Sequence, residues 1–167
     1  MNRSKLRENI FKLLYTAEFQ EKEEMPQQMS LYFTYSDDND EDEEVTVSEK
    51  DQTYMEEKYH HVTEHIPEID EMLNRTSEGW KTTRMGKVDL AILRLAVYEM
   101  KFDEDVPVGV AINEAVELAR AFGGEDDSHR FVNGILGRLA RLSESEQGVA
   151  AEAPTEEASE GVAEAAP

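Results

Sequence analysis

The first fifteen residues hold a cluster of cationic side chains that could bind an anion. The stretch contains one acid, Glu8, and an aromatic ring, Tyr15. Its cations are Arg3, Lys5, Arg7 and Lys12. We interpret it as the only strongly basic stretch in the chain. Cations are unfavourable at the start of a helix, so a bound anion would offset that cost, whereas the alternative interpretation is a solvated helix start without a ligand.

Three histidines are close enough in the sequence to be considered as zinc ligands. His61 and His65 are spaced to share a helix face, next to His60. The glutamate that a zinc protease needs directly after the first histidine is replaced by Val62. We therefore expect surface histidines and no metal site here.

An acidic segment contains a second set of candidate metal ligands. Those with the spacing of a calcium-binding loop are Asp38, Asp40, Asp42 and Glu49. Glu43 stands where the sharp turn of such a loop needs glycine, so we expect only weak cation binding. The chain also shows no paired carboxylates, nucleophile elbow or phosphate-binding glycine loop, and we expect no enzyme activity, no catalytic residue and no cofactor.

Two segments account for much of the negative charge. The chain has 38 acids against 17 lysines and arginines, which gives a net charge of −21. Residues 37–44 and 144–167 each carry seven acids and no base, and the remainder sums to −7. This charge excludes a general polyanion binder, which needs a net basic field. A local basic cluster can keep its own sign, because salt screens exposed charges over about 8 Å.

Apolar residues recur at helical spacing, and no segment alternates with a period of two. Residues 4–19 predict an amphipathic helix with Ser4 as its N-cap. Residues 88–100 are apolar almost all round, which is typical of a central helix in a bundle. Further helices are expected over residues 48–65, 66–78, 107–122 and 127–142. The predicted fold class is all-α, a compact bundle of six or seven helices.

The composition predicts one domain and a tail. We expect a helical domain over residues 1–143, with a flexible acidic loop at 36–46, and a disordered Ala/Glu-rich tail at 144–167. The absence of cysteine excludes a disulfide scaffold and a thiolate metal site. The sequence shows neither an apolar signal core nor an apolar run of membrane-spanning length, so we expect a cytoplasmic protein without a membrane partner.

About sixty residues of the second half follow a more specific pattern. The block begins with Trp80-x-x-x-Arg84-Met85-x-x-Val88-Asp89-x-Ala91-Ile92-Leu93-Arg94-Leu95-Ala96-x-Tyr98-Glu99. It continues with Val106-Pro107-x-x-Val110-Ala111-Ile112-Asn113-Glu114-Ala115-Val116-Glu117-Leu118-Ala119. It closes with Phe122-Gly123 and Ser128-His129-Arg130-Phe131-Val132-Asn133-Gly134-Ile135-Leu136. This block resembles the NusB family, and the basic first helix is similar to the start of that family.

The resemblance implies a fold and a function. The fold would be two packed three-helix units. The function would be transcription antitermination, in which the protein binds boxA-like RNA together with NusE, a small-subunit ribosomal protein. This assembly would then dock on the RNA polymerase elongation complex, chiefly over ribosomal RNA operons. The oligomeric state is left open, a homodimer included.

The resemblance also assigns roles to particular residues. Those expected to bind RNA are Arg3, Lys5, Arg7, Tyr15, Arg130 and Phe131. Such residues suit single-stranded RNA, since cations hold phosphates and aromatic rings stack on bases. Asp89 and Arg94 match positions on the helix that faces NusE.

Several alternatives stay open at this point. From periodicity alone Phe131 is a core residue, and Asp89 and Arg94 could be members of an internal ion pair instead of interface contacts. The chain could be a NusB-like protein-interaction bundle that has lost most RNA binding. It could also belong with RNA cytosine methyltransferases that carry a NusB-like domain, although we expect no methyl-donor domain in the residues after Leu142.

Overall fold

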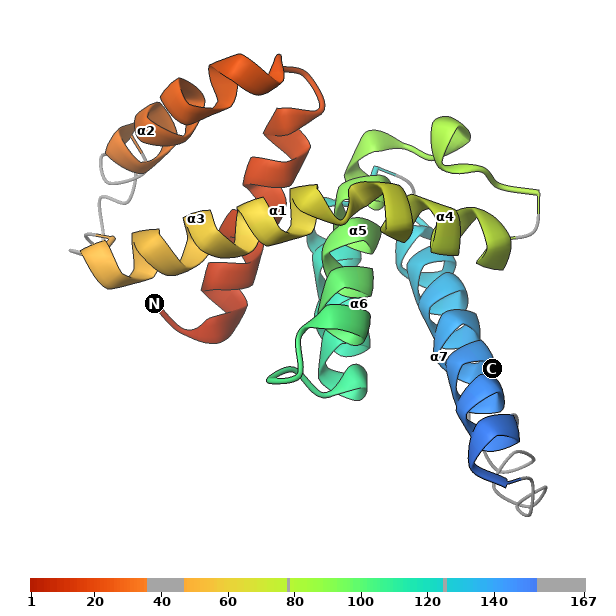
Figure 1. The fold of residues 1–167 in the computed structure, drawn as a ribbon. Coiled ribbons are helices and arrows are strands. Elements are labelled where there is room, and N and C mark those ends of the chain that lie inside the picture. Colours follow the sequence, from red (N-terminus) through yellow and green to blue (C-terminus); the bar gives the residue numbers. More distant parts are fainter. Residues whose placement is uncertain (36–46, 78, 125, 153–167) are drawn as a thin grey trace. The chain divides into compact units, whose positions relative to one another are not determined.

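The computed structural model describes residues 1–35, 47–77, 79–124 and 126–152 (Figure 1). In these ranges the chain forms helices joined by turns and no β-strand, which confirms the all-α prediction. The chain divides into two compact units, Met1–His65 and Ile66–Pro167. The acidic loop expected at 36–46, with the calcium-type spacing inside it, lies outside the described residues.

The first unit begins with α1 (Arg3–Ala17). Its N-cap is Asn2, whose side-chain oxygen accepts a hydrogen bond from the Lys5 backbone N–H at 2.8 Å. The expected cap, Ser4, is therefore wrong, because asparagine is an equally good cap and stands two residues earlier. The buried side chains of α1 include Ile10, Phe11, Leu13 and Leu14.

Within this unit α1 packs against α3 (Glu49–Glu64). Ser48 caps α3 by accepting a hydrogen bond from the Asp51 N–H at 3.1 Å. The apolar spacing of residues 48–65 predicts Tyr54 on the inward stripe, but Tyr54 is exposed, because it lies one residue before the buried series. That series follows the helical repeat and comprises Met55, Tyr59 and Val62.

A short 3₁₀ turn, Lys22–Glu24, leads into α2 (Met25–Tyr35). The side chain of Asn9 on α1 connects the two helices, since it accepts a hydrogen bond from the Tyr32 hydroxyl and donates one to the Lys5 carbonyl at 2.8 Å. The buried side chains of α2 recur every four residues and are Met25, Met29 and Phe33.

In its described residues the second unit contains four α-helices and a 3₁₀ turn, Thr82–Arg84. The helices are α4 (Ile66–Thr76), α5 (Lys87–Phe102), α6 (Val108–Phe122) and α7 (Ser128–Glu152). Helix α5 packs against the other three, as its apolar surface predicts. No helix in the described part of the chain is both long and apolar enough to cross a membrane.

Two expectations about helix ends and faces in this unit are wrong. The last helix was expected to end at Leu142, but α7 continues to Glu152. Residues 143–152 are rich in Ala, Glu and Gln, which have favourable helix propensities. The rest of the expected tail, residues 153–167, lies outside the described residues. On α6, Leu118 is buried where Phe122 was expected, because Phe122 lies in the last turn and remains exposed.

Close packing joins the end of α6 to the start of α7. A Cβ on Gly123 would lie 2.4 Å from the Ala119 carbonyl oxygen and 2.6 Å from the Ser128 Cβ. Real Cβ atoms are not found at such distances, so only glycine fits there. The carbonyl of Asp127 then accepts the first hydrogen bonds of α7, from the amides of Arg130 and Phe131.

A bidentate ion pair joins α4 to α5. The Arg94 guanidinium donates from Nε to Asp70 Oδ1 at 2.9 Å and from Nη2 to Oδ2 at 2.8 Å. The two side chains are 12% and 22% exposed, so water screens the pair only in part. Such two-point geometry orients the helices as well as adding energy.

Gly123→Ala is expected to lower the free energy of unfolding by about 1–3 kcal/mol through overpacking. The backbone φ of −60° at Gly123 suits alanine, so the effect would be steric. Gly124→Ala is the matched control, since a Cβ there meets nothing within 4 Å. Chemical denaturation measures both variants, and equal midpoints would contradict the packing argument.

The ion pair can be tested with a double-mutant cycle of Arg94→Met and Asp70→Asn. We expect a coupling free energy of about 0.5–3 kcal/mol, because the two groups share two hydrogen bonds in a partly buried place. Urea unfolding of the single and double variants gives the coupling free energy. Repeating the measurement at low and high salt shows how far salt screens it. Additive single effects would mean that the pair does not stabilise the unit.

Candidate nucleic-acid interface

The predicted RNA-binding residues lie in both units. Arg3, Lys5, Arg7 and Tyr15 belong to α1 in the first unit, whereas Arg130 and Phe131 belong to the first turn of α7 in the second. Each group is described on its own below, beginning with α1.

One face of α1 carries a charged cluster that was only partly expected. Lys5 and Lys12 each donate to the same Oε2 atom of Glu8 at 3.1 Å. Residues spaced by three or four along a helix meet in this way. Burial acts to raise the pKa of Glu8, but the two ammonium groups outweigh it and hold the pKa below its usual value. The carboxylate therefore stays ionised and offsets part of the cluster's positive charge.

The two arginines at the start of α1 differ in exposure. Arg3 is exposed, whereas Arg7 is only 7% exposed. Arg7 lies three and seven residues before Ile10 and Leu14, so the helical repeat puts it on their buried face. The expectation that Arg7 shares a solvated face with Lys5 is therefore wrong, and its role in binding stays a prediction.

Tyr15 continues the face of Lys5 and Lys12 toward the end of α1. Its ring is half-buried and meets Phe19 edge to face, with ring centroids 5.0 Å apart. Phe19 is 58% exposed and lies just beyond the end of the helix. Such an exposed aromatic pair beside lysines could stack on bases. The sequence interpretation did not single out Phe19, although it lies four residues after Tyr15.

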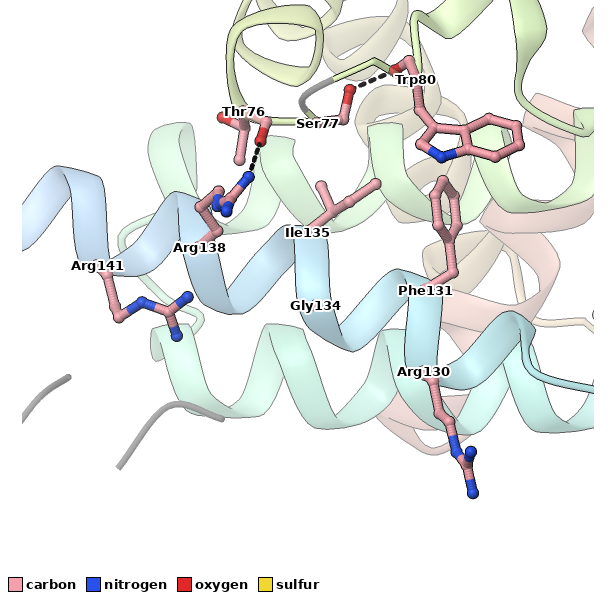
Figure 2. Close-up of a pocket in the computed structure, with 9 residues that line it drawn as sticks. All are labelled: Thr76, Ser77, Trp80, Arg130, Phe131, Gly134, Ile135, Arg138 and Arg141. Atoms are coloured by element: carbon pink, nitrogen blue, oxygen red, sulfur yellow. Dashed lines mark hydrogen bonds between the residues drawn. The ribbon is translucent and has the colours of Figure 1, made fainter. Parts of the chain in front are cut away.

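The start of α7 offers a second cation beside aromatic rings. Arg130 is exposed. Phe131 is half-buried, so it is neither a core residue nor a fully exposed one. The Phe131 ring meets the Trp80 indole edge to face with centroids 6.0 Å apart, and Trp80 is 56% exposed. Figure 2 shows the two rings on one side of α7 and the Arg130 side chain extending from the other.

A tight turn positions Trp80. The backbone N–H of Trp80 donates to the Ser77 carbonyl at 2.7 Å, and the Ser77 hydroxyl donates to the Trp80 carbonyl. Gly79 has a φ of +83°, a left-handed conformation that other residues adopt with strain. The glycine thus allows the chain to reverse directly after α4 and to bring the indole to Phe131.

These rings form one end of an open pocket with a volume of about 360 Å³. Figure 2 shows its residues, which are Thr76, Ser77, Trp80, Arg130, Phe131, Gly134, Ile135, Arg138 and Arg141. Arg138 donates from Nη1 to the Thr76 carbonyl at 3.2 Å, which fixes its guanidinium at the edge.

The sequence interpretation missed this part of the surface. Trp80 served there only as part of a motif, and the first helix was taken as the only strongly basic stretch. Yet residues 128–143 contain three arginines and no acid. Arg130 and Arg141 are eleven residues apart, about three helical turns, which places them on one helix face. Arg138 lies three residues before Arg141, and its side chain extends from the other side of α7 in Figure 2. This spacing is the signal that could have found them.

The two residues expected to contact NusE lie on α5. Asp89 is in its first turn, where an acid suits the helix dipole, and accepts a hydrogen bond from the Ser128 hydroxyl at 3.4 Å. Arg94 forms the ion pair with Asp70 described above. The internal pair left open from the sequence is therefore present for Arg94, and a partner contact by either residue stays a prediction.

The candidate metal ligands do not gather into a site in the described part of the chain. No group of three or more histidines or acids there could hold an ion. His65 instead hydrogen-bonds through Nδ1 to the His61 carbonyl at 2.7 Å, which is a local helix-end contact.

Comparisons with known proteins agree with this architecture. The model of the NusB family matches residues 4–141. The transcription antitermination protein NusB of Agathobacter rectalis is 48% identical over 140 residues, covering 84% of this chain and all of the relative. That of Lachnoclostridium phytofermentans is 44% identical, covering 83% of this chain and 98% of the relative.

Solved structures extend the comparison to the fold. NusB of T. maritima superposes with a TM-score of 0.69 at 30% identity, covering 84% of this chain and 92% of that one. A structure of antitermination factors NusB and NusE with dsRNA superposes with a TM-score of 0.65 at 22% identity, covering 84% and 96%, and so supports the fold alone. With its helical units, its family match and these relatives, the chain belongs to the NusB family of transcription antitermination proteins, which are not enzymes.

Proposed function

We propose that the chain binds boxA-type single-stranded RNA together with NusE and thereby helps the RNA polymerase elongation complex to transcribe ribosomal RNA operons. One observation carries the proposal. Both segments that the resemblance assigns to RNA carry at least one exposed cation and a pair of aromatic rings, one ring of each pair being largely exposed. Phosphate-binding cations next to stacking rings are the usual means of holding single-stranded RNA.

On α1 the contacts would come from Arg3, Lys5 and Tyr15. Lys5 already lies against Glu8, so binding a phosphate there would exchange a carboxylate partner for a phosphate. The Tyr15–Phe19 pair lies farther along the same helix and would stack on a base. Glu8 would weaken attraction to RNA in general and leave the affinity dependent on the full set of contacts.

On α7 the contacts would come from Arg130 and Phe131. Arg130 is exposed at the first turn, where backbone N–H groups also favour an anion. The Phe131 ring is steadied by its edge contact with Trp80, so little freedom would be lost when a base stacks on it.

NusE would meet the chain at the α5 positions Asp89 and Arg94. Support comes from the partial exposure of both side chains, which leaves them accessible to a partner. Asp89 lies beside the first residue of α7, so a partner bound there would approach the turn that carries Arg130. A homodimer could use the same surfaces in the absence of RNA and NusE.

Lys5→Gln is expected to weaken binding to boxA-type RNA and to lower the log–log salt slope by about 0.7, the value for one lost phosphate contact on a single strand. Glu8→Gln should strengthen binding, because the carboxylate that holds Lys5 and Lys12 would be gone. Fluorescence anisotropy with labelled RNA over a salt series measures both effects.

Arg3→Gln and Arg7→Gln provide the comparison within α1. Arg3→Gln should lower the salt slope as Lys5→Gln does. Arg7→Gln should lower the thermal stability and leave the salt slope nearly unchanged, because Arg7 is buried. If none of these variants changes RNA affinity, the first helix is a solvated helix start. The chain would then fit a protein-interaction bundle that has lost most RNA binding.

Asp89→Lys is expected to weaken NusE binding at least tenfold, about 1.4 kcal/mol, because it reverses a charge at the expected interface. Calorimetry with purified NusE measures the affinity, and circular dichroism checks that the helical content is unchanged. Asp89→Asn keeps the shape and tests the charge alone. Wild-type affinity in a folded Asp89→Lys protein would contradict the assignment.

A further inference from the structure

The pocket beside α7 continues past Arg130 and Phe131, the two residues that the resemblance assigns to RNA. Its remaining lining includes Trp80, Gly134, Arg138 and Arg141. We propose that this α7 groove, defined by those four residues, holds additional nucleotides of the same single-stranded RNA. The inference rests on the proposed function and extends it from single contacts to a continuous path along α7.

The positive charge of the groove favours a negatively charged ligand. The pocket as a whole has nine lining residues, which include three arginines and no acid, and two of those arginines belong to the groove, in a chain whose net charge is −21. Arg130 and Arg141 are eleven residues apart on one helix face, a distance of about 16 Å along the axis. This separation is longer than one phosphate group, so it suits several consecutive phosphates of a nucleic-acid strand.

The indole of Trp80 supplies a surface for a base. It is 56% exposed although it is the largest aromatic side chain, and its edge contact with Phe131 fixes its orientation. The hydrogen-bonded turn between Ser77 and Trp80 fixes the backbone beneath it. A rigid, exposed ring at one end of a pocket lined by arginines is a suitable platform for stacking, which tolerates any base.

Arg138 is arranged to bind a phosphate at the same edge. Its bond to the Thr76 carbonyl orients the planar guanidinium before a ligand arrives. A pre-oriented fork loses less side-chain freedom on binding than a mobile one. Figure 2 shows Trp80, Phe131 and Arg138 on one side of α7, and Arg130 and Arg141 on the other.

Gly134 lies between these two edges and leaves the helix backbone uncovered. A Cβ at this position would meet nothing within 4 Å, and its φ is not in the left-handed region, so neither packing nor conformation requires glycine. Glycine inside a helix is nevertheless less favourable than alanine. Close approach of a ligand to the backbone is a use of glycine that fits the open floor of the groove.

The test compares a minimal boxA-type RNA with the same RNA lengthened by a few nucleotides at each end. Wild-type protein, with NusE present, should bind the longer RNA about tenfold more tightly, as expected for one further stacked base. Gly134→Leu should remove most of that gain and leave the affinity for the minimal RNA unchanged. Trp80→Ala should also remove the gain, and it should weaken binding of the minimal RNA as well, because Trp80 steadies the Phe131 ring. Trp80→Phe should keep the gain, since it keeps a stacking ring.

Salt titration separates the arginine contacts from stacking. Arg141→Gln should lower the salt slope for the longer RNA by about 0.7 and leave the slope for the minimal RNA unchanged. Arg120→Gln is the matched control, because it removes the same charge from an exposed place on α6 that does not line the groove. Trp80→Ala should change affinity with little change in slope.

The outcomes distinguish the two proposals. If the minimal RNA binds but lengthening it gives no gain, or if the gain survives in Trp80→Ala, Gly134→Leu and Arg141→Gln, the groove is not an RNA path. If these variants lose NusE affinity and keep the gain, the groove is a protein contact. If the minimal RNA does not bind at all, the proposed function fails and the groove proposal fails with it.

Discussion

The position of α7 depends on the contact between Gly123 and Ser128. A side chain larger than hydrogen at residue 123 would collide with the end of its own helix and with the first residue of the next. Because the contact is so close, α7 starts at a fixed point against α6. The first turn of α7 then presents Arg130 and Phe131, and its later turns present Arg138 and Arg141. A packing constraint between two small residues thus sets the position of four larger ones.

A second constraint comes from charge. A chain with a net charge of −21 repels RNA at long range, yet exposed charges are screened over about 8 Å at physiological salt. Attraction must therefore come from clusters in which cations outnumber acids locally. Residues 128–143 satisfy this with three arginines and no acid, whereas α1 includes Glu8 among its lysines. Both stretches carry a net charge of +3, but only the α7 stretch contains no acid.

The sequence predicts the helices of this fold well, because long stretches keep one period, although the cap it assigns to the first helix, Ser4, is wrong. It predicts individual faces less well. Arg7 is charged, but its spacing from Ile10 and Leu14 places it with the buried residues. Phe122 is apolar, but it falls in the last turn of α6, where it is 37% exposed. In both cases position along the helix decides burial, and residue type alone misleads.

The parts of the candidate site that follow from the spacing of residues along one helix were predictable from the sequence. The parts that depend on contacts between helices were not. The arginine stripe of α7 can be found from residue numbers alone. The meeting of Trp80 with Phe131 cannot, because it requires the turn at Gly79 and the packing of α4 against α7. The same applies to Arg138, whose guanidinium is oriented by a carbonyl at the end of α4. Since both contacts are with the end of α4 or the turn that follows it, the geometry of the groove depends on how α4 packs against α7. Loosening that contact would free the indole and the guanidinium together, and each would then lose more conformational entropy on binding a nucleotide.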